Sequence, residues 1–220
     1  LDLERTGSLS NAGINRTLQA LHVCSRKLRK LGVKNARLVA TEACRRAKNG
    51  EAFMNRIRNE TGLTLEVINT AEEARLALVS CAPLLEPLAE HVLVVDIGGG
   101  STELVWVDLT EVAPADKVKA MINLRPGDIT ANRLPGARIV DWISVPLGVA
   151  TLMQRFSDVQ EDGAKFALMA CHFEDELEAF SPYHELVGPE IMAKLQVIGT
   201  SGTVTTLGAM HLGLRRYDRN

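Results

Sequence analysis

The stretch from Val92 to Val107, VLVVDIGGGSTELVWV, constrains the fold most strongly, because two apolar runs flank an acidic residue and three consecutive glycines. Two such runs joined by Gly98, Gly99 and Gly100 predict two antiparallel strands and a tight turn. Glycine can adopt positive φ, and it lets another group approach the backbone closely. The stretch therefore predicts a β-hairpin whose turn can accept a ligand.

A phosphate group suits this turn. Backbone N–H groups of a glycine turn, together with the hydroxyls of Ser101 and Thr102, form an anion-binding concavity. The carboxylates of Asp96 and Glu103 could hold a cation that the phosphate also touches. The alternative is an ordinary hairpin with a glycine-rich turn and no ligand, but the flanking carboxylates favour the phosphate interpretation.

The rest of the chain alternates between segments of strand and helix periodicity. Caps at Ser10 and Asn11 begin a helix that Gly32 ends. Further strands are predicted at 36–41, 63–68, 138–145 and 195–198, and further helices at 51–60, after Thr70, at 149–156, at 161–180 and from the 199–203 turn to about 212. This alternation predicts an α/β fold containing a parallel layer, interrupted by an irregular, proline-containing insertion near 109–137.

Composition excludes several classes of protein. The 220 residues are 46% hydrophobic, which supports a buried core. A net charge of -2 argues against a nucleic-acid binder that works by bulk electrostatics, and no apolar run reaches the length of a membrane span. Four scattered cysteines without CxxC spacing predict buried, reduced thiols and a cytoplasmic protein. The sequence leaves the oligomeric state open, a homodimer being one option.

Four motifs, in this order, carry a resemblance to a known family. They are ATEACRRA at 40–47, NTAEEARLA at 69–77, DIGGGSTE at 96–103 and GTSGT at 199–203. Together they resemble the exopolyphosphatase and guanosine pentaphosphate phosphatase family, which belongs to the actin-like ATPase superfamily. DIGGGSTE is similar to the family's second phosphate-binding motif, and the match extends over nearly the whole chain.

The resemblance implies an actin-like (ribonuclease H-like) two-lobed α/β fold, with mixed sheets flanked by helices. We expect the first lobe at 1–90 and the second at 91–220, with the insertion near 109–137 in the second lobe. Family members begin with a strand and an Asp-x-Gly-Ser-Asn type of phosphate loop, and nothing of that kind precedes Leu1. The first lobe is therefore expected to be incomplete, so that this fragment by itself is expected to be inactive.

The resemblance also implies Mg²⁺-dependent hydrolysis that releases orthophosphate from inorganic polyphosphate or guanosine pentaphosphate. Glu73 matches the family's base or water-positioning glutamate, with Glu72 as its solvent-facing rival. Asp96 and Glu103 are expected to support Mg²⁺ and the attacking water. The alternatives are a solvated acid on a helix face for Glu73 and a turn-stabilising acceptor for Asp96.

The phosphate itself is expected to contact an arginine and three turns. Arg45 matches the family's phosphate-binding arginine, and its alternative role is to pair with an acid. The expected phosphate-binding set is Arg45, Gly98, Gly99, Gly100, Ser101, Thr102, Gly148, Gly199, Ser201, Gly202 and Thr203. The helix that begins after the last of these turns would favour an anion at its N-terminus.

Two other functions stay open at this point. One is a sensor that binds guanosine tetra- or pentaphosphate without turnover. The other is an ATP-dependent sugar kinase or chaperone-type ATPase of the same superfamily. The EEAR helix ahead of DIGGGSTE argues against the second of these.

Overall fold

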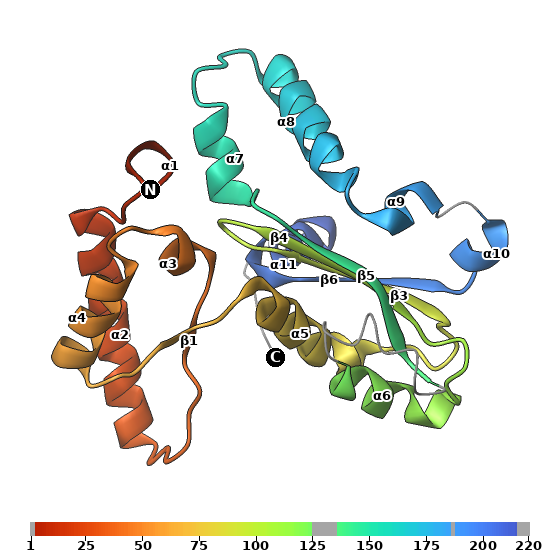
Figure 1. Ribbon diagram of the computed structural model, residues 1–220, viewed down its shortest axis with the longest axis horizontal. Helices are drawn as coiled ribbons and strands as arrows, with labels where there is room; N and C mark the ends of the chain where they lie inside the picture. Colours follow the sequence, from red (N-terminus) through yellow and green to blue (C-terminus); the bar gives the residue numbers. More distant parts are fainter. Residues whose placement is uncertain (1–2, 125–135, 186–187, 215–220) are drawn as a thin grey trace. The chain divides into compact units, whose positions relative to one another are not determined.

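The computed structural model describes residues 3–124, 136–185 and 188–214, and the chain divides into two compact units, Leu1–Thr70 and Ala71–Asn220 (Figure 1). Each unit has its own hydrophobic core. The lobe boundary expected near residue 90 stays a prediction.

The first unit is mainly helical. Its elements are α1 (Leu3–Thr6), α2 (Asn11–Lys30), β1 (Val39–Ala40), α3 (Glu42–Arg46), α4 (Gly50–Thr61) and β2 (Glu66–Val67). The predicted cap is confirmed, because the Ser10 hydroxyl accepts a hydrogen bond from the backbone N–H of Gly13 at 3.2 Å. Helix α4 ends at Gly62, whose φ of 73° is left-handed.

The two strands predicted in this unit are much shorter than expected. They pair in parallel over only two residues each, with Val39 opposite Glu66 and Ala40 opposite Val67. Both β2 residues are exposed, so side-chain burial does little to stabilise a ladder longer than two pairs. The predicted strands 36–41 and 63–68 therefore form only in part.

The second unit contains a four-stranded sheet with helices around it. Its elements are α5 (Thr70–Cys81), η1 (Ala82–Leu84), β3 (His91–Ile97), β4 (Thr102–Asp108), η2 (Pro114–Asp116), α6 (Lys117–Asn123), β5 (Arg138–Val145), α7 (Val149–Arg155), α8 (Asp162–Leu177), α9 (Ser181–Glu185), α10 (Pro189–Met192), β6 (Leu195–Thr200) and α11 (Ser201–His211). The strand order is β5-β4-β3-β6, in which β3 is antiparallel to β4 and parallel to β6. The predicted hairpin and the mixed α/β class are confirmed.

Each face of this sheet packs against different helices. On one face Ala74 and Leu78 of α5 pack with the alternate strand residues Val94 and Val105. On the other face Trp106 joins a cluster with residues around α8, α9 and α10. Figure 1 shows α5 and α6 on the side of the sheet opposite to α8. Because side chains alternate along a strand, every residue of the hairpin faces one of two covered surfaces.

Two expectations need correction. The insertion expected at 109–137 is not irregular throughout, because α6 forms within it and anchors on the fully buried Met121; residues 125–135 of that insertion lie outside the described residues. All four cysteines are free, but Cys24 and Cys171 are exposed rather than buried, because they lie on outward positions of α2 and α8.

Among the described helices, none combines the length and apolar character needed to cross a bilayer.

Candidate functional site

The hairpin turn closes through its own backbone. The N–H of Gly98 donates to the carbonyl of Ser101 at 2.9 Å, so this amide is already used inside the turn. Gly98 and Gly99 do not adopt the positive φ that glycine makes available. A segment of the protein itself approaches this turn closely, because a Cβ added at Gly148 would lie 2.5 Å from the carbonyl carbon of Gly99 and 2.6 Å from the nitrogen of Gly100.

The start of α7 holds this turn in place. The N–H of Val149 donates to the carbonyl of Gly98 at 3.1 Å, and the N–H of Ala150 donates to the carbonyl of Gly99 at 2.9 Å. These bonds satisfy N–H groups that a helix start leaves unpaired. They also engage carbonyl oxygens of the turn that would otherwise repel an approaching anion.

The side chain of Thr102 helps to hold the hairpin against the segment just before α7. It is 2% exposed, and its hydroxyl donates to the carbonyl of Leu147 at 2.7 Å. We therefore leave the Thr102 hydroxyl out of the proposed phosphate contacts, although the sequence placed it there.

Two carboxylates face each other across the hairpin. The strand register pairs Asp96 of β3 with Glu103 of β4, on the face that α5 covers. Glu103 is only 2% exposed, and its Oε1 accepts a hydrogen bond from the Ser144 hydroxyl at 2.9 Å. Among the described residues, the buried Oδ1 of Asp96 has no hydrogen-bond partner. Like charges directly opposite each other are unfavourable, so this pair is costly for the fold by itself.

A third acid, Glu73, acts on Glu103 through its charge. Burial raises the pKa of Glu103; hydrogen bonds from Ser101 and Ser144 oppose this shift, while the charges of Glu73 and Asp96 add to it. Burial also raises the pKa of Asp96, and hydrogen bonding from the Ser201 hydroxyl opposes it. Glu73 and Asp96 therefore lie close enough to Glu103 for their charges to disfavour its ionised form.

These carboxylates suit a Mg²⁺ ion that the protein and the substrate would coordinate together. Within the part of the chain that the structure describes, no three His, Cys, Asp or Glu side chains form a metal-binding group by themselves. Mg²⁺ usually needs only one or two carboxylates, because water and substrate phosphates supply its other oxygens. Asp96 and Glu103 provide two carboxylates, and the unpartnered Oδ1 of Asp96 is an oxygen suited to a cation.

A second turn lies beside the hairpin, where β6 ends and α11 begins. Ser201 has a φ of 75°, the one positive value among the non-glycine residues that the structure describes. Such a conformation costs free energy and is frequent at functional sites. The turn packs tightly, because a Cβ at Gly199 would lie 2.6 Å from Cγ1 of Val204, and the Thr203 hydroxyl donates to the carbonyl of Ile97 at 3.1 Å.

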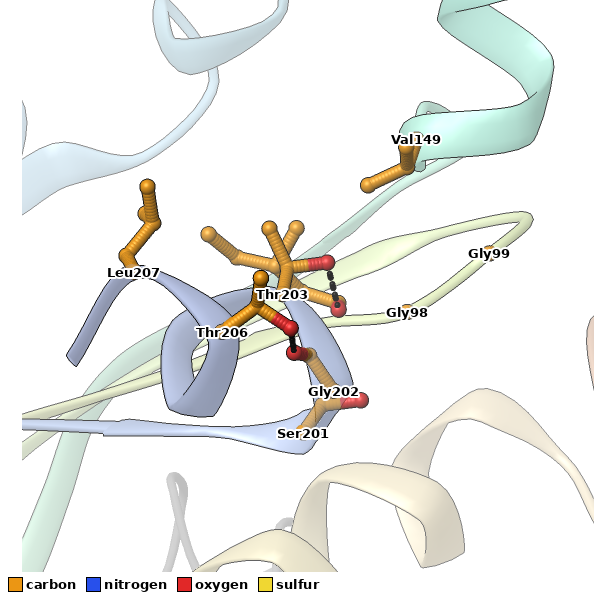
Figure 2. Close-up of a pocket in the computed structure, with 9 residues that line it drawn as sticks. Gly98, Gly99, Val149, Ser201, Gly202, Thr203, Thr206 and Leu207 are labelled. Atoms are coloured by element: carbon orange, nitrogen blue, oxygen red, sulfur yellow. Dashed lines mark hydrogen bonds between the residues drawn. The ribbon is translucent and has the colours of Figure 1, made fainter. Parts of the chain in front are cut away.

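The two turns border an open, shallow pocket of about 570 Å³ (Figure 2). It is lined by Ile97, Gly98, Gly99, Val149, Ser201, Gly202, Thr203, Thr206 and Leu207. Figure 2 shows the hairpin turn on one side and the first turns of α11 on the other, with Val149 reaching in from α7. A Cβ at Gly99 or Gly202 would meet no atom within 4 Å, so both glycines border open space. The volume lies in the range of small-molecule sites.

Two further predicted residues have local partners. Arg45 belongs to the first unit, where it donates to the carbonyl of Ile68 at 2.9 Å and pairs with Glu42 at 2.9 Å. This is the acid-pairing alternative raised from the sequence, and the phosphate role of Arg45 stays a prediction. In the second unit Glu72 pairs with Arg75 at 2.6 Å, so it is held on its own helix.

Sequence reasoning missed Ser144 and Val149. Ser144 stands two positions before Pro146, and nothing in the neighbouring sequence distinguishes it. The only available signal was indirect: a strand that pairs with β4 must place some residue opposite Glu103. The pairing register decides that this residue is Ser144.

Comparison with known protein families matches residues 2–214 to the Ppx/GppA phosphatase family. The chain belongs to this family. The match covers all four motifs and both units, which confirms the resemblance drawn from the sequence. The family is one of phosphatases.

Solved structures agree with this assignment. The Ppx/GppA family member of Aquifex aeolicus is 30% identical, with a TM-score of 0.62 over 99% of this chain and 59% of that chain. An exopolyphosphatase from Cytophaga hutchinsonii is 23% identical, with a TM-score of 0.69 over 97% of this chain and 59% of that chain. An exopolyphosphatase-like protein is 24% identical, with a TM-score of 0.74, and the match covers 61% of its length. The actin-like fold is thus confirmed, and the chain spans about three fifths of these Ppx/GppA structures.

Proposed function

We propose that this chain forms part of a Mg²⁺-dependent hydrolase that releases orthophosphate from the ends of inorganic polyphosphate or from guanosine pentaphosphate. The observation that carries the proposal is the pair of the half-buried Asp96 and the buried Glu103, which face each other directly beside the glycine turn. Two like charges so close together and shielded from water destabilise the fold unless a cation or a proton neutralises them. Family membership supplies the phosphate chemistry.

Each part of the site has a proposed role. Asp96 and Glu103 would hold Mg²⁺, which when bound supplies positive charge to the phosphoryl oxygens. The hairpin turn, held by α7, would place the terminal phosphate through backbone N–H groups of Gly99 and Gly100. Glu73, whose charge acts on Glu103, would orient the attacking water and accept its proton.

A comparison of Glu73→Gln with Glu72→Gln tests this assignment in the full-length protein. We expect Glu73→Gln to lower kcat for phosphate release from long-chain polyphosphate by roughly 10²–10⁴-fold, because the amide cannot accept the proton of water. Glu72→Gln is the matched control, since Glu72 pairs with Arg75 on the same helix, and it should stay within about twofold of wild type.

Equal turnover of the two variants would remove Glu73 from the mechanism. Absence of phosphate release by wild-type protein with either substrate, at every Mg²⁺ concentration, would reject the hydrolase proposal itself.

The second candidate, binding of guanosine tetra- or pentaphosphate without turnover, draws support from the pocket. Three apolar side chains line it beside the glycine turn, namely Ile97, Val149 and Leu207. A nucleoside presents apolar surface that polyphosphate lacks, so such a lining would favour a guanosine ligand. Calorimetry separates the candidates: tight binding of the nucleotide with no phosphate release favours the sensor.

A further inference from the structure

Ser144 lies where it can control one of the two site carboxylates. Strand β5 pairs antiparallel with β4, and the register places Ser144 directly opposite Glu103. The Ser144 hydroxyl donates to Oε1 of Glu103 at 2.9 Å. Cross-strand neighbours of this kind have their Cβ atoms about 5 Å apart, so a short serine side chain reaches the carboxylate without strain.

The surroundings of Glu103 make this hydrogen bond important. Glu103 is 2% exposed, and it has the acidic residues Asp96 and Glu73 close by. Its hydrogen-bonding neighbours are the hydroxyls of Ser101 and Ser144. A buried carboxylate that loses a donor is left with an unsatisfied charge, and it turns toward whatever donor remains.

The two serines differ in how firmly the backbone holds them. Ser101 ends the glycine turn, outside the strand ladder, whereas Ser144 lies inside β5. The Thr102–Val145 and Leu104–Ile143 pairs flank it in the ladder, so its backbone position is determined on both sides. Ser144 is therefore the donor whose direction depends least on the turn or on a bound ligand.

We propose that Ser144 is a positioning residue, whose hydroxyl keeps the Glu103 carboxylate in the orientation in which it faces Asp96 across the hairpin. The inference rests on the proposed hydrolase function, in which Glu103 and Asp96 share a divalent cation. Ser144 does not touch the substrate in this role; it acts through Glu103.

The substitutions Ser144→Thr and Ser144→Val in the full-length protein test the role of the hydroxyl. The two new side chains have nearly the same shape, and both are β-branched and suited to a strand, but only threonine keeps the donor. Three measurements are needed: kcat and KM for phosphate release from polyphosphate, Mn²⁺ affinity by calorimetry without substrate, and the unfolding temperature.

We expect Ser144→Val to lower kcat and Mn²⁺ affinity by roughly 10–100-fold, as for other residues that orient metal ligands. KM should change by less than about threefold, because the phosphate contacts of the glycine turn are not altered. Ser144→Thr should restore both kcat and Mn²⁺ affinity to within about threefold of wild type, and this rescue would not occur if only packing mattered.

Equal behaviour of the threonine and valine variants, in both kcat and Mn²⁺ affinity, would overturn the proposal. If Ser144→Val does not fold, Ser144→Ala takes its place as the variant without a hydroxyl. The two claims are tested by different measurements. Absence of phosphate release by the wild-type protein would reject the hydrolase function, whereas the Mn²⁺ affinities of the variants would still decide whether the Ser144 hydroxyl orients Glu103.

Discussion

Asp96 and Glu103 are two acids placed where acids are unfavourable. Each lies on the buried face of the hairpin, directly opposite the other. Burial raises the pKa of both carboxyl groups, and for Glu103 the neighbouring charges add to the effect. Buried polar groups that weaken a fold are typical of functional sites, where the same groups are needed for chemistry.

The sign of this effect gives a pH prediction for metal-free protein. The folded state binds the Glu103 proton more tightly than the unfolded state does, so stability falls as pH rises from the ordinary value of 4.5 through the raised pKa of the folded state. In EDTA at pH 8, Glu103→Gln should therefore be more stable than wild type by about 0.5–2 kcal/mol. The difference should shrink toward pH 5, as measured by urea unfolding.

Glu103→Gln should also lose phosphate release, so that one substitution raises stability while it removes activity. Wild type more stable than Glu103→Gln at pH 8 in EDTA would show that the carboxylate is neutralised by a group other than a bound cation.

At the scale of elements, helix α7 supports the glycine turn of the hairpin. Its first two N–H groups donate to carbonyls of Gly98 and Gly99, while Gly148 permits the close approach. The glycine requirement at 148 thus comes from contact between two backbone segments, whereas a Cβ at Gly99 would meet no atom of the fold within 4 Å.

Gly148→Ala and Gly99→Ala should have different effects on stability, because only at Gly148 would an added Cβ meet other backbone atoms. At Gly148 a Cβ would lie 2.5 Å from backbone that cannot rotate away, so Gly148→Ala should cost about 1–3 kcal/mol of unfolding free energy. At Gly99 nothing lies within 4 Å, so Gly99→Ala should change stability by less than about 0.5 kcal/mol.

Gly99→Ala should instead raise KM for polyphosphate, because its methyl group would occupy the space proposed for phosphate. Thermal unfolding together with steady-state kinetics checks both variants. A stable Gly148→Ala protein would show that the helix and the turn separate easily.

On the scale of the whole molecule, the two units have separate cores. The first unit buries Ile14, Leu18, Phe53 and Ile57 between α2 and α4, whereas the second has a cluster on each face of a four-stranded sheet. None of these described clusters mixes residues from both units. The smaller core should open more often, because less apolar area must be exposed.

Hydrogen exchange followed by mass spectrometry tests this difference. Ile57 is fully buried, so Ile57→Ala should destabilise the first unit by about 2–5 kcal/mol and speed amide exchange within residues 3–70. Leu78→Ala is the matched control, because Leu78 is equally buried in the second unit. Faster exchange throughout the chain in both variants would show that the units unfold together.

Local sequence determined most of the secondary structure and the family. The helix beginning after Ser10, the helix ending before Gly62 and the hairpin around Gly98 follow from caps, glycines and periodicity within a few residues. The four motifs could be read in the same local way, and family comparison confirmed what they imply together. Where local signals were weak, as in the insertion near 109–137, the prediction missed helix α6.

The tertiary structure alone decided how the site is held together. Ser144 meets Glu103 across 41 positions of sequence, and α7 reaches the turn across about 50, through strand pairing and close packing. The positive φ of Ser201 likewise follows from its position between β6 and α11, since serine has no strong preference for that conformation. The sequence by itself determined which acids and glycines are present. Only long-range pairing decided which atoms face them, because a register is a property of two strands and cannot be read from either one.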